Sequence, residues 1–380
     1  MRRLHFVDAR IVTRDQIIHG DLTVTEGRIQ SISKCSSGRG LEQVDLKGDL
    51  LLPGLVELHT DNLEKNIQPR PGVLWPSILA AAIAHDNQIV GSGITTVLDA
   101  LAIGGLRKGG LDSSILDQSF NAICQGQEQK LFKADHALHL RCEVADPQIE
   151  ALLPVYGKHP LVKLISVMDH TPGQRQWTDL EKWRLYHRDK RWTDQQAEEV
   201  QQKRLELQDK HADKNRNLAI SFAQQRQLQL ASHDDTTMTD TQASTKAGIT
   251  IAEFPTTLVA AKTAKKYGMS VVMGAPNIVR GGSHSGNVSA IELAKLGLLD
   301  GLSSDYVPAS LLHSAFYLAD KLNIPLPQTV AMVSTHVAEM VGFTDRGEIS
   351  EGKRADLIQV TPVDGLPIVR RVWREGRQVS

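Results

Sequence analysis

The pattern of hydrophobic and polar positions changes twice along the 380 residues. Up to about residue 53, short segments alternate between apolar and polar residues, and the same style returns near the carboxyl end. Such alternation is typical of half-buried β-strands. Neither end carries enough apolar surface to fold alone, so we expect both ends to meet in one small β domain. The expected strands cover residues 4–7, 10–12, 20–24, 28–32, 356–360 and 368–373.

Between the two ends, fully apolar runs alternate with helical patterns. One helical pattern, over 256–267, stops at Gly268 and is followed at once by an apolar run over 270–273. Repeated strand–helix units predict an α/β fold whose eight parallel strands close into a TIM-like (β/α)8 barrel. We expect the barrel over residues 54–342, and a small β-sandwich domain built from residues 1–53 and 343–380.

One stretch interrupts this rhythm. From residue 174 to about 229 the chain is dense in charged residues and glutamine, and Thr193 and Gln196 stand in capping-box register before a long helical pattern. The stretch is too long for an ordinary connection, so we predict a helical insertion near the barrel. It is either a solvated charged face or a lid whose basic residues meet phosphates, with Arg175, Arg184 and Lys190 as the examples.

Composition limits the classes of partner. Lys and Arg number 43 against 44 Asp and Glu, so no global field favours nucleic acid or a membrane surface. No run approaches the roughly 20 apolar residues of a membrane span, and the first residues lack a signal-peptide core, so we expect a cytoplasmic protein. The three cysteines, Cys35, Cys124 and Cys142, are widely separated, and we expect them to be reduced and structural.

The first chemical signal is His59-Thr60-Asp61, at the end of the apolar run 51–58. Residues two positions apart on a strand project from the same face, so both side chains can reach one cation. Each such residue alone is more often a cap or a turn residue. The interpretation as the opening of a metal-dependent hydrolase barrel therefore depends on the residues that follow.

Four more residues of ligand type end separate predicted strands downstream. Together with His59 and Asp61, these residues make six predicted ligands. In barrel order they would surround one point at the mouth of the barrel, where the carboxyl ends of the strands converge, and would hold one or two divalent ions. Zinc or manganese suits a mixed imidazole and carboxylate set. Asp169 and Asp234 alternate to the other face and are expected to stay outside, whereas Arg141 and His139 share the face of Glu143 and could pair with it. The six predicted ligands are His59, Asp61, Glu143, His170, His233 and Asp305.

A glycine-rich stretch over 275–287 follows a predicted strand and precedes a predicted helix near Val288. Glycines let backbone N–H groups approach an anion, so the stretch is either a phosphate-binding loop or a structural turn. Two further arginines lie on the same predicted rim. The predicted substrate-binding residues are Arg70, Arg175, Asn277, Arg280, Gly281, Gly282, Ser283 and His284.

With these residues assembled, the chain resembles the amidohydrolase superfamily over essentially its full length, and within it the branch that serves the bacterial carbon–phosphorus lyase pathway. The segments that carry the resemblance are 52–65, 168–176, 231–235, 274–287 and 303–306. The resemblance implies hydrolysis of a ribose 5-triphosphate bearing a 1-alkylphosphonate, which yields the 5-phosphate and pyrophosphate. It also implies that Glu143 stands where many relatives carry a carboxylated lysine that bridges two metals.

The expected mechanism and its rivals follow from this set. Asp305 is the predicted general base, since a carboxylate on the last strand can both bind metal and accept a proton from water. One rival keeps the fold and cuts a C–N bond, as a cyclic amidase or deacetylase does. Another is a non-catalytic scaffold, which need not retain its ligands. The size of the chain is compatible with a homodimer, although no segment marks an interface.

Overall fold

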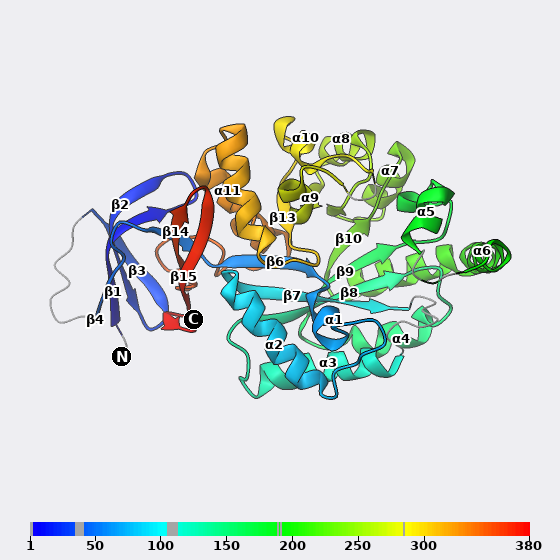
Figure 1. Cartoon of the computed structure of the whole chain (residues 1–380), viewed down its shortest axis with the longest axis horizontal. Helices are drawn as coiled ribbons and strands as arrows, with labels where there is room; N and C mark the ends of the chain where they lie inside the picture. The colour runs from blue at the N-terminus through cyan, green and yellow to red at the C-terminus, as the bar shows by residue number, and fades with distance from the viewer. Residues whose placement is uncertain (1–2, 35–41, 105–112, 188–189, 191, 284–285) are drawn as a thin grey trace.

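A computed structural model describes residues 3–34, 42–104, 113–187, 190, 192–283 and 286–380 (Figure 1). Cys35 and His284 lie outside these residues, and Cys124 and Cys142 are free thiols. Within the described part of the chain, no helix is long and apolar enough to cross a membrane.

Eight parallel strands follow one another around a nearly closed barrel, as predicted. An isolated parallel bridge between Thr60 and Asp305 brings the last strand beside the first. Strands such as β6 are buried along their whole length because helices cover the outside and side chains fill the inside. The barrel strands are β6 (Leu55–Thr60), β7 (Ile94–Ile103), β8 (Asp135–Glu143), β9 (Val162–Met168), β10 (Gln229–His233), β11 (Ile251–Glu253), β12 (Ser270–Gly274) and β13 (Gly301–Ser303).

Helices connect successive strands on the outside of the barrel (Figure 1). The predicted helix before Gly268 forms α8, and Gly268 follows it with a φ of 77°, a left-handed conformation that glycine adopts without strain. The helices apart from the insertion are α1 (Asn62–Ile67), α2 (Ile78–Gly91), α3 (Ser113–Glu128), α4 (Ile149–Tyr156), α7 (Met238–Lys246), α8 (Leu258–Lys266), α9 (Ala275–Arg280), α10 (Ala290–Lys295), α11 (Ser310–Leu322), α12 (Leu326–Ala331) and α13 (Thr335–Met340).

Both ends of the chain share a second, mixed sheet beside the barrel, as expected for a small β domain (Figure 1). Phe6 and Trp373, from opposite ends of the sequence, pack edge to face with ring centroids 5.0 Å apart. We propose that the domains divide as the sequence predicts, since β5 ends at Pro53 and β6 begins at Leu55. The sheet contains β1 (Arg3–Val12), β2 (Ile17–Thr25), β3 (Arg28–Ser33), β4 (Glu42–Asp45), β5 (Leu50–Pro53), β14 (Leu357–Val363), β15 (Leu366–Arg374) and β16 (Arg377–Gln378).

The charged stretch between β9 and β10 contains a short 3-10 helix, η1 (Arg175–Trp177), then α5 (Leu180–Tyr186) and the 32-residue α6 (Asp194–Gln225). The capping box is confirmed, because Thr193 and Gln196 exchange side-chain to backbone hydrogen bonds at the start of α6. Further along α6, Asn215 is 2% exposed and its amide donates to two backbone oxygens just after β8. The insertion is thus anchored to the barrel by a buried side chain.

Candidate metal centre

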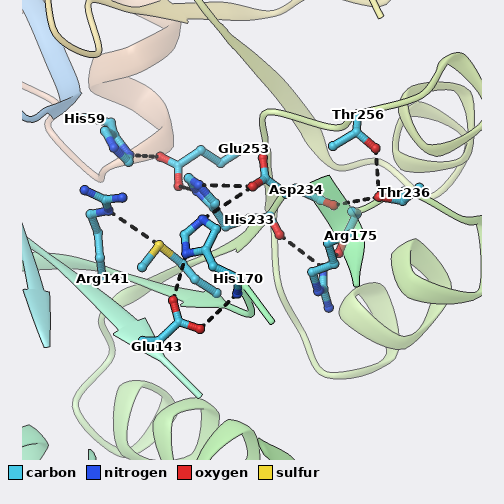
Figure 2. A network of polar contacts seen from close by, with 12 residues as sticks. His59, Arg141, Glu143, His170, Arg175, His233, Asp234, Thr236, Glu253 and Thr256 are labelled. Carbon is cyan, nitrogen blue, oxygen red and sulfur yellow. Dashed lines mark hydrogen bonds and ion pairs between the residues drawn. The ribbon is translucent and has the colours of Figure 1, made fainter. Parts of the chain in front are cut away.

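Three histidines meet where β6, β9 and β10 end. The rings of His59 and His233 stack with centroids 5.7 Å apart, and the His170 ring stands edge-on to His233 at 5.4 Å (Figure 2). The parallel strands carry all three to the same end of the barrel. The structure therefore brings together the imidazoles that the sequence placed on three separate strands.

A carboxylate binds the Nδ1 atom of each ring. Glu253 accepts from His59 at 2.7 Å with one oxygen and from His233 at 2.8 Å with the other (Figure 2). Glu143 accepts from Nδ1 of His170 at 2.7 Å and from its backbone N–H at 2.9 Å. Carboxylates in this position fix the ring and leave Nε2 as the atom that can bind a metal.

The three Nε2 atoms face other carboxylates. His59 Nε2 lies 3.7 Å from Asp61 Oδ1. His170 and His233 each place Nε2 3.6 Å from Asp234 Oδ2. These separations suit a cation about 2.1 Å from each of two ligand atoms.

The ligand atoms gather into groups in which all atoms lie within 4.8 Å of one another. One group is His59, Asp61 and Asp305, and a second is His170, His233 and Asp234. The donor set of imidazole and carboxylate fits a divalent ion. The fold and these groups together point to a divalent metal.

Asp234 corrects one expectation. Strand alternation predicted that its side chain would point away from the site, and that is wrong, because Asp234 has a φ of 59° and its backbone leaves the extended conformation. The backbone N–H of Asp234 donates to the backbone carbonyl oxygen of Glu253 at 3.0 Å. This bond holds the turn at the end of β10. The carboxylate consequently joins His170 and His233 instead of the outer face.

Asp305 also has a left-handed backbone, with a φ of 52°. It is tied to the first barrel strand by two backbone hydrogen bonds, from Asp305 N to His59 O at 3.1 Å and from Asp61 N to Asp305 O at 2.8 Å. Burial and the neighbouring Asp61 carboxylate raise the pKa of Asp305 above its usual value. The barrel closure therefore places two predicted acidic ligands from opposite ends of the barrel sequence side by side.

Glu253 and Glu143 occupy places that sequence reasoning did not assign. Glu253 is fully buried at the end of β11 and was missed, although it ends a barrel strand just as the predicted ligands do. Its two histidine partners hold its pKa well below the usual value, against the effect of burial. Glu143, predicted as a ligand, directs both oxygens to His170 and joins none of the ligand groups found among the described residues.

Burial and neighbouring charged groups shift the pKa values of the histidines in and near the centre. Burial opposes the charged form of His170, but Glu143 and Asp234 outweigh it and raise the pKa to about 10. His139, deeper on β8, behaves in the opposite way, since burial lowers its pKa to about 3. Its Nδ1 donates to Leu58 O at 3.0 Å, and its buried Nε2 has no hydrogen-bond partner among the described residues. A neutral imidazole with an unpaired nitrogen beside His59 and Glu253 also suits a cation.

The arginines predicted to bind an anion come from three separate segments of the chain. Arg175 donates to His233 O at 3.1 Å and pairs with Asp235, so it ties η1 to the end of β10 (Figure 2). Arg70 is exposed in a turn that its carbonyl oxygen closes with Val73 N. Arg280 is exposed at the end of α9.

The first half of the glycine-rich stretch is helix α9. The N–H groups of Gly281 and Gly282 donate to Ile278 O and Asn277 O, at 3.1 and 2.9 Å, and close the end of this helix. The Asn277 side chain accepts from Ala290 N at 3.1 Å, where α10 begins. These groups are engaged within the chain, and Ser283 follows them half-buried.

Comparison with solved structures identifies the fold class. The chain superposes over 100% of its length on a Xaa-Pro dipeptidase (100% of that chain, TM-score 0.68, 14% identity). It also superposes over 100% of its length on N-isopropylammelide isopropylaminohydrolase from Burkholderia multivorans (98% of that chain, TM-score 0.67, 15% identity). A third match is N-acetylglucosamine-6-phosphate deacetylase from Pasteurella multocida (100% of both chains, TM-score 0.62, 13% identity). These matches show the fold of the chain, and the candidate metal centre lies at the mouth of that barrel.

Sequence comparison is more specific. No family model matches the chain. Alpha-D-ribose 1-methylphosphonate 5-triphosphate diphosphatase from Escherichia coli is 46% identical over 375 residues, which cover 98% of this chain and 99% of the relative. The chain belongs to the family of this diphosphatase.

Proposed function

We propose that the protein is a metal-dependent hydrolase that cleaves α-D-ribose 1-methylphosphonate 5-triphosphate to the 5-phosphate and pyrophosphate in phosphonate catabolism. The observation that carries this proposal is the 46% identity to the diphosphatase over almost the full length of both chains. The cluster of imidazoles and carboxylates at the mouth supports a metal-dependent reaction. We place the enzyme in the cytoplasm, because a multiply charged triphosphate does not cross a membrane unaided.

Each residue at the mouth has a proposed task. When bound, one or two divalent ions, zinc or manganese, would supply a water of lowered pKa and neutralise phosphate charge. Glu143 and Glu253 would orient the histidines through Nδ1. The residues proposed to hold the metal are His59, Asp61, His170, His233, Asp234 and Asp305.

Asp305 is the proposed general base. Its backbone is fixed against β6, and its carboxylate lies with His59 and Asp61. A carboxylate in this position can accept the proton of the attacking water. Phosphoryl transfer otherwise requires mainly positioning and charge neutralisation.

The phosphates are proposed to meet the rim of the mouth. Arg280 supports this best, because it is exposed at the end of the segment that follows β12. Arg70, Ser283 and His284 are also proposed to take part. Arg175, Asn277, Gly281 and Gly282 are proposed to do so only if a bound phosphate replaces the contacts that they make within the chain.

The decisive experiment is phosphorus NMR of the metal-loaded protein with the ribose 1-methylphosphonate 5-triphosphate, beside a chelator-treated control. We expect pyrophosphate to appear only with metal. In the same assay, Asp305→Asn should abolish turnover with the fold retained, and a substantial residual rate would remove Asp305 from the base role. An unchanged spectrum from folded, metal-loaded wild-type protein would favour hydrolysis of a C–N bond.

A further inference from the structure

Arg141 lies within the metal centre, although neither the orientation of the histidines nor the proposed base requires it. It projects from the inner face of β8, and its Nη1 donates to Asp61 Oδ1 at 2.6 Å. The same Asp61 oxygen lies 3.7 Å from His59 Nε2. The guanidinium is therefore a direct neighbour of the ligand group formed by His59, Asp61 and Asp305. Figure 2 shows Arg141 beside His59.

The position of this guanidinium is defined on two sides. Nε donates to Met168 Sδ at 3.4 Å, on the neighbouring strand, while Nη1 is bound to Asp61. The Arg141 side chain is 11% exposed, whereas the Asp61 side chain that it contacts is 26% exposed. The contact thus lies where the interior of the barrel opens to its mouth, within reach of a ligand that enters there.

The side chain also supplies a permanent positive charge, because a guanidinium is not deprotonated in proteins. Asp61 binds it directly, and Asp305 belongs to the same ligand group as Asp61. Arg141 therefore places a fixed cation beside the carboxylates of the centre.

We propose that Arg141 is a catalytic residue that contacts the phosphoryl group under attack and stabilises the charge on its oxygens. This inference rests on the proposed function. In the step, a water oxygen forms a bond to phosphorus while the anhydride P–O bond breaks. The electron pair of that bond stays on the leaving phosphate oxygen, and the water proton passes to the Asp305 carboxylate.

The chemistry explains why arginine suits this position. The planar fork of a guanidinium matches two phosphoryl oxygens, and it remains charged beside a metal, where an ammonium would lose its proton more readily. Phosphoryl transfer spreads negative charge over several oxygens, and a positioned arginine is a recurrent means of neutralising it. Cleavage of a C–N bond develops charge on one oxygen, for which a metal ion suffices.

The test compares Arg141→Gln and Arg141→Lys with a matched control, Arg346→Gln. Arg346 is also mostly buried and also binds a carboxylate, that of Asp135 at 2.8 Å, but Asp135 begins β8 at the opposite end of the barrel. The measurements are kcat and KM for the triphosphate, bound metal by elemental analysis, and rescue of Arg141→Ala by added guanidinium ion.

We expect Arg141→Gln to lower kcat by about 100- to 1,000-fold, the loss typical of one transition-state donor, with bound metal unchanged. Arg141→Lys should recover part of that loss, guanidinium should partly rescue Arg141→Ala, and Arg346→Gln should keep its kcat. The inference is overturned if Arg141→Gln retains kcat within about fivefold, or if its loss of rate matches a loss of metal. Wild-type enzyme that releases no pyrophosphate would instead refute the proposed function, and the role of Arg141 with it.

Discussion

At the scale of single residues, Glu253 organises the candidate metal centre more than any predicted ligand does. One buried carboxylate orients two histidines from different strands through their Nδ1 atoms. A histidine whose Nδ1 is bound in this way presents Nε2 as a ligand with a fixed direction. The geometry of the centre therefore depends on a residue that need not touch the metal.

Replacing Glu253 with Gln should weaken metal binding by about 10- to 100-fold, because the amide can accept from only one of the two histidines. Titration of the metal-free protein against a chelating dye would measure the change. Glu339→Gln is a suitable control, since Glu339 pairs with Arg14 on the surface with both side chains about half exposed. Equal affinities for Glu253→Gln and wild type would show that the histidines do not need this carboxylate.

A second buried polar cluster lies away from the mouth. His136 binds Asp99 through Nδ1 at 2.7 Å and Asp86 through Nε2 at 3.2 Å, and His85 binds the other oxygen of Asp99 at 2.7 Å. Burial disfavours the charged imidazole, but Asp99 and Asp86 outweigh it and raise the pKa of His136 to about 9. Burial likewise opposes the ionised form of Asp99, but its histidines lower the pKa to about 2, so Asp99 stays ionised near neutral pH.

This cluster predicts a pH dependence of stability. A histidine with a raised pKa stabilises the fold fully below its unfolded pKa of about 6.5, and loses that contribution as pH rises through about 9. We expect the free energy of unfolding of wild type to exceed that of His136→Gln most at pH 6, and the difference to shrink between pH 7 and pH 10. Urea unfolding at several pH values would measure it, and a difference that grows with pH would contradict the assignment.

At the scale of elements, the insertion depends on how α6 is attached to the barrel. Asn215 donates to Val144 O at 2.9 Å and to Asp146 O at 2.8 Å, in the connection that follows β8. Since Glu143 ends β8, this contact supports the backbone next to a residue of the centre. The charged residues on the exterior of α6 stabilise the fold less, because exposed ion pairs such as Lys214 with Glu150 contribute little to the free energy of unfolding.

Asn215→Ala should lower the free energy of unfolding by about 2 to 4 kcal/mol, since two buried carbonyl oxygens lose their donor. Asn87→Ala provides the comparison, because Asn87 donates to Ile83 O in an exposed position on α2 and should cost less than about 1 kcal/mol. Denaturant unfolding monitored by circular dichroism would measure both. Equal losses in the two variants would mean that α6 is not held by this contact.

At the scale of the whole molecule, the centre joins strands from the beginning, middle and end of the barrel. The first and last strands meet through the backbone bonds between Asp305 and the residues at the end of β6. A ligand that binds only the folded chain stabilises it by mass action. A metal held by residues from so many strands should thus stabilise the barrel as a unit.

Removing the metal should therefore lower the unfolding temperature. At free metal one hundred times its Kd, the stabilisation is about 2.7 kcal/mol. Thermal unfolding with chelator, and after the metal is restored, would measure the shift. In Glu253→Gln the shift in unfolding temperature should be smaller at the same metal concentration. Identical unfolding temperatures of the wild type with and without metal would contradict a metal site that exists only in the folded chain.

Local sequence pattern predicted most of the elements. The apolar runs identified the barrel strands, Gly268 marked the end of α8, and Thr193 with Gln196 marked the start of α6. These signals depend on side-chain periodicity and on a few backbone preferences, which neighbouring residues determine. For the same reason His59, His170, His233 and Asp305 could be placed at one end of the barrel without coordinates.

What the sequence by itself determined is the barrel, the strand ends on which its histidines lie, and membership in the diphosphatase family. Only the tertiary structure decided which atoms face each other. His59 and its carboxylate partner Glu253 are separated by 194 positions, so no local pattern relates them. The left-handed turn at Asp234 reverses the direction that strand alternation predicts, and packing between strands directs Arg141 to Asp61. Periodicity is a property of neighbouring residues, whereas hydrogen-bond partners depend on how distant strands pack.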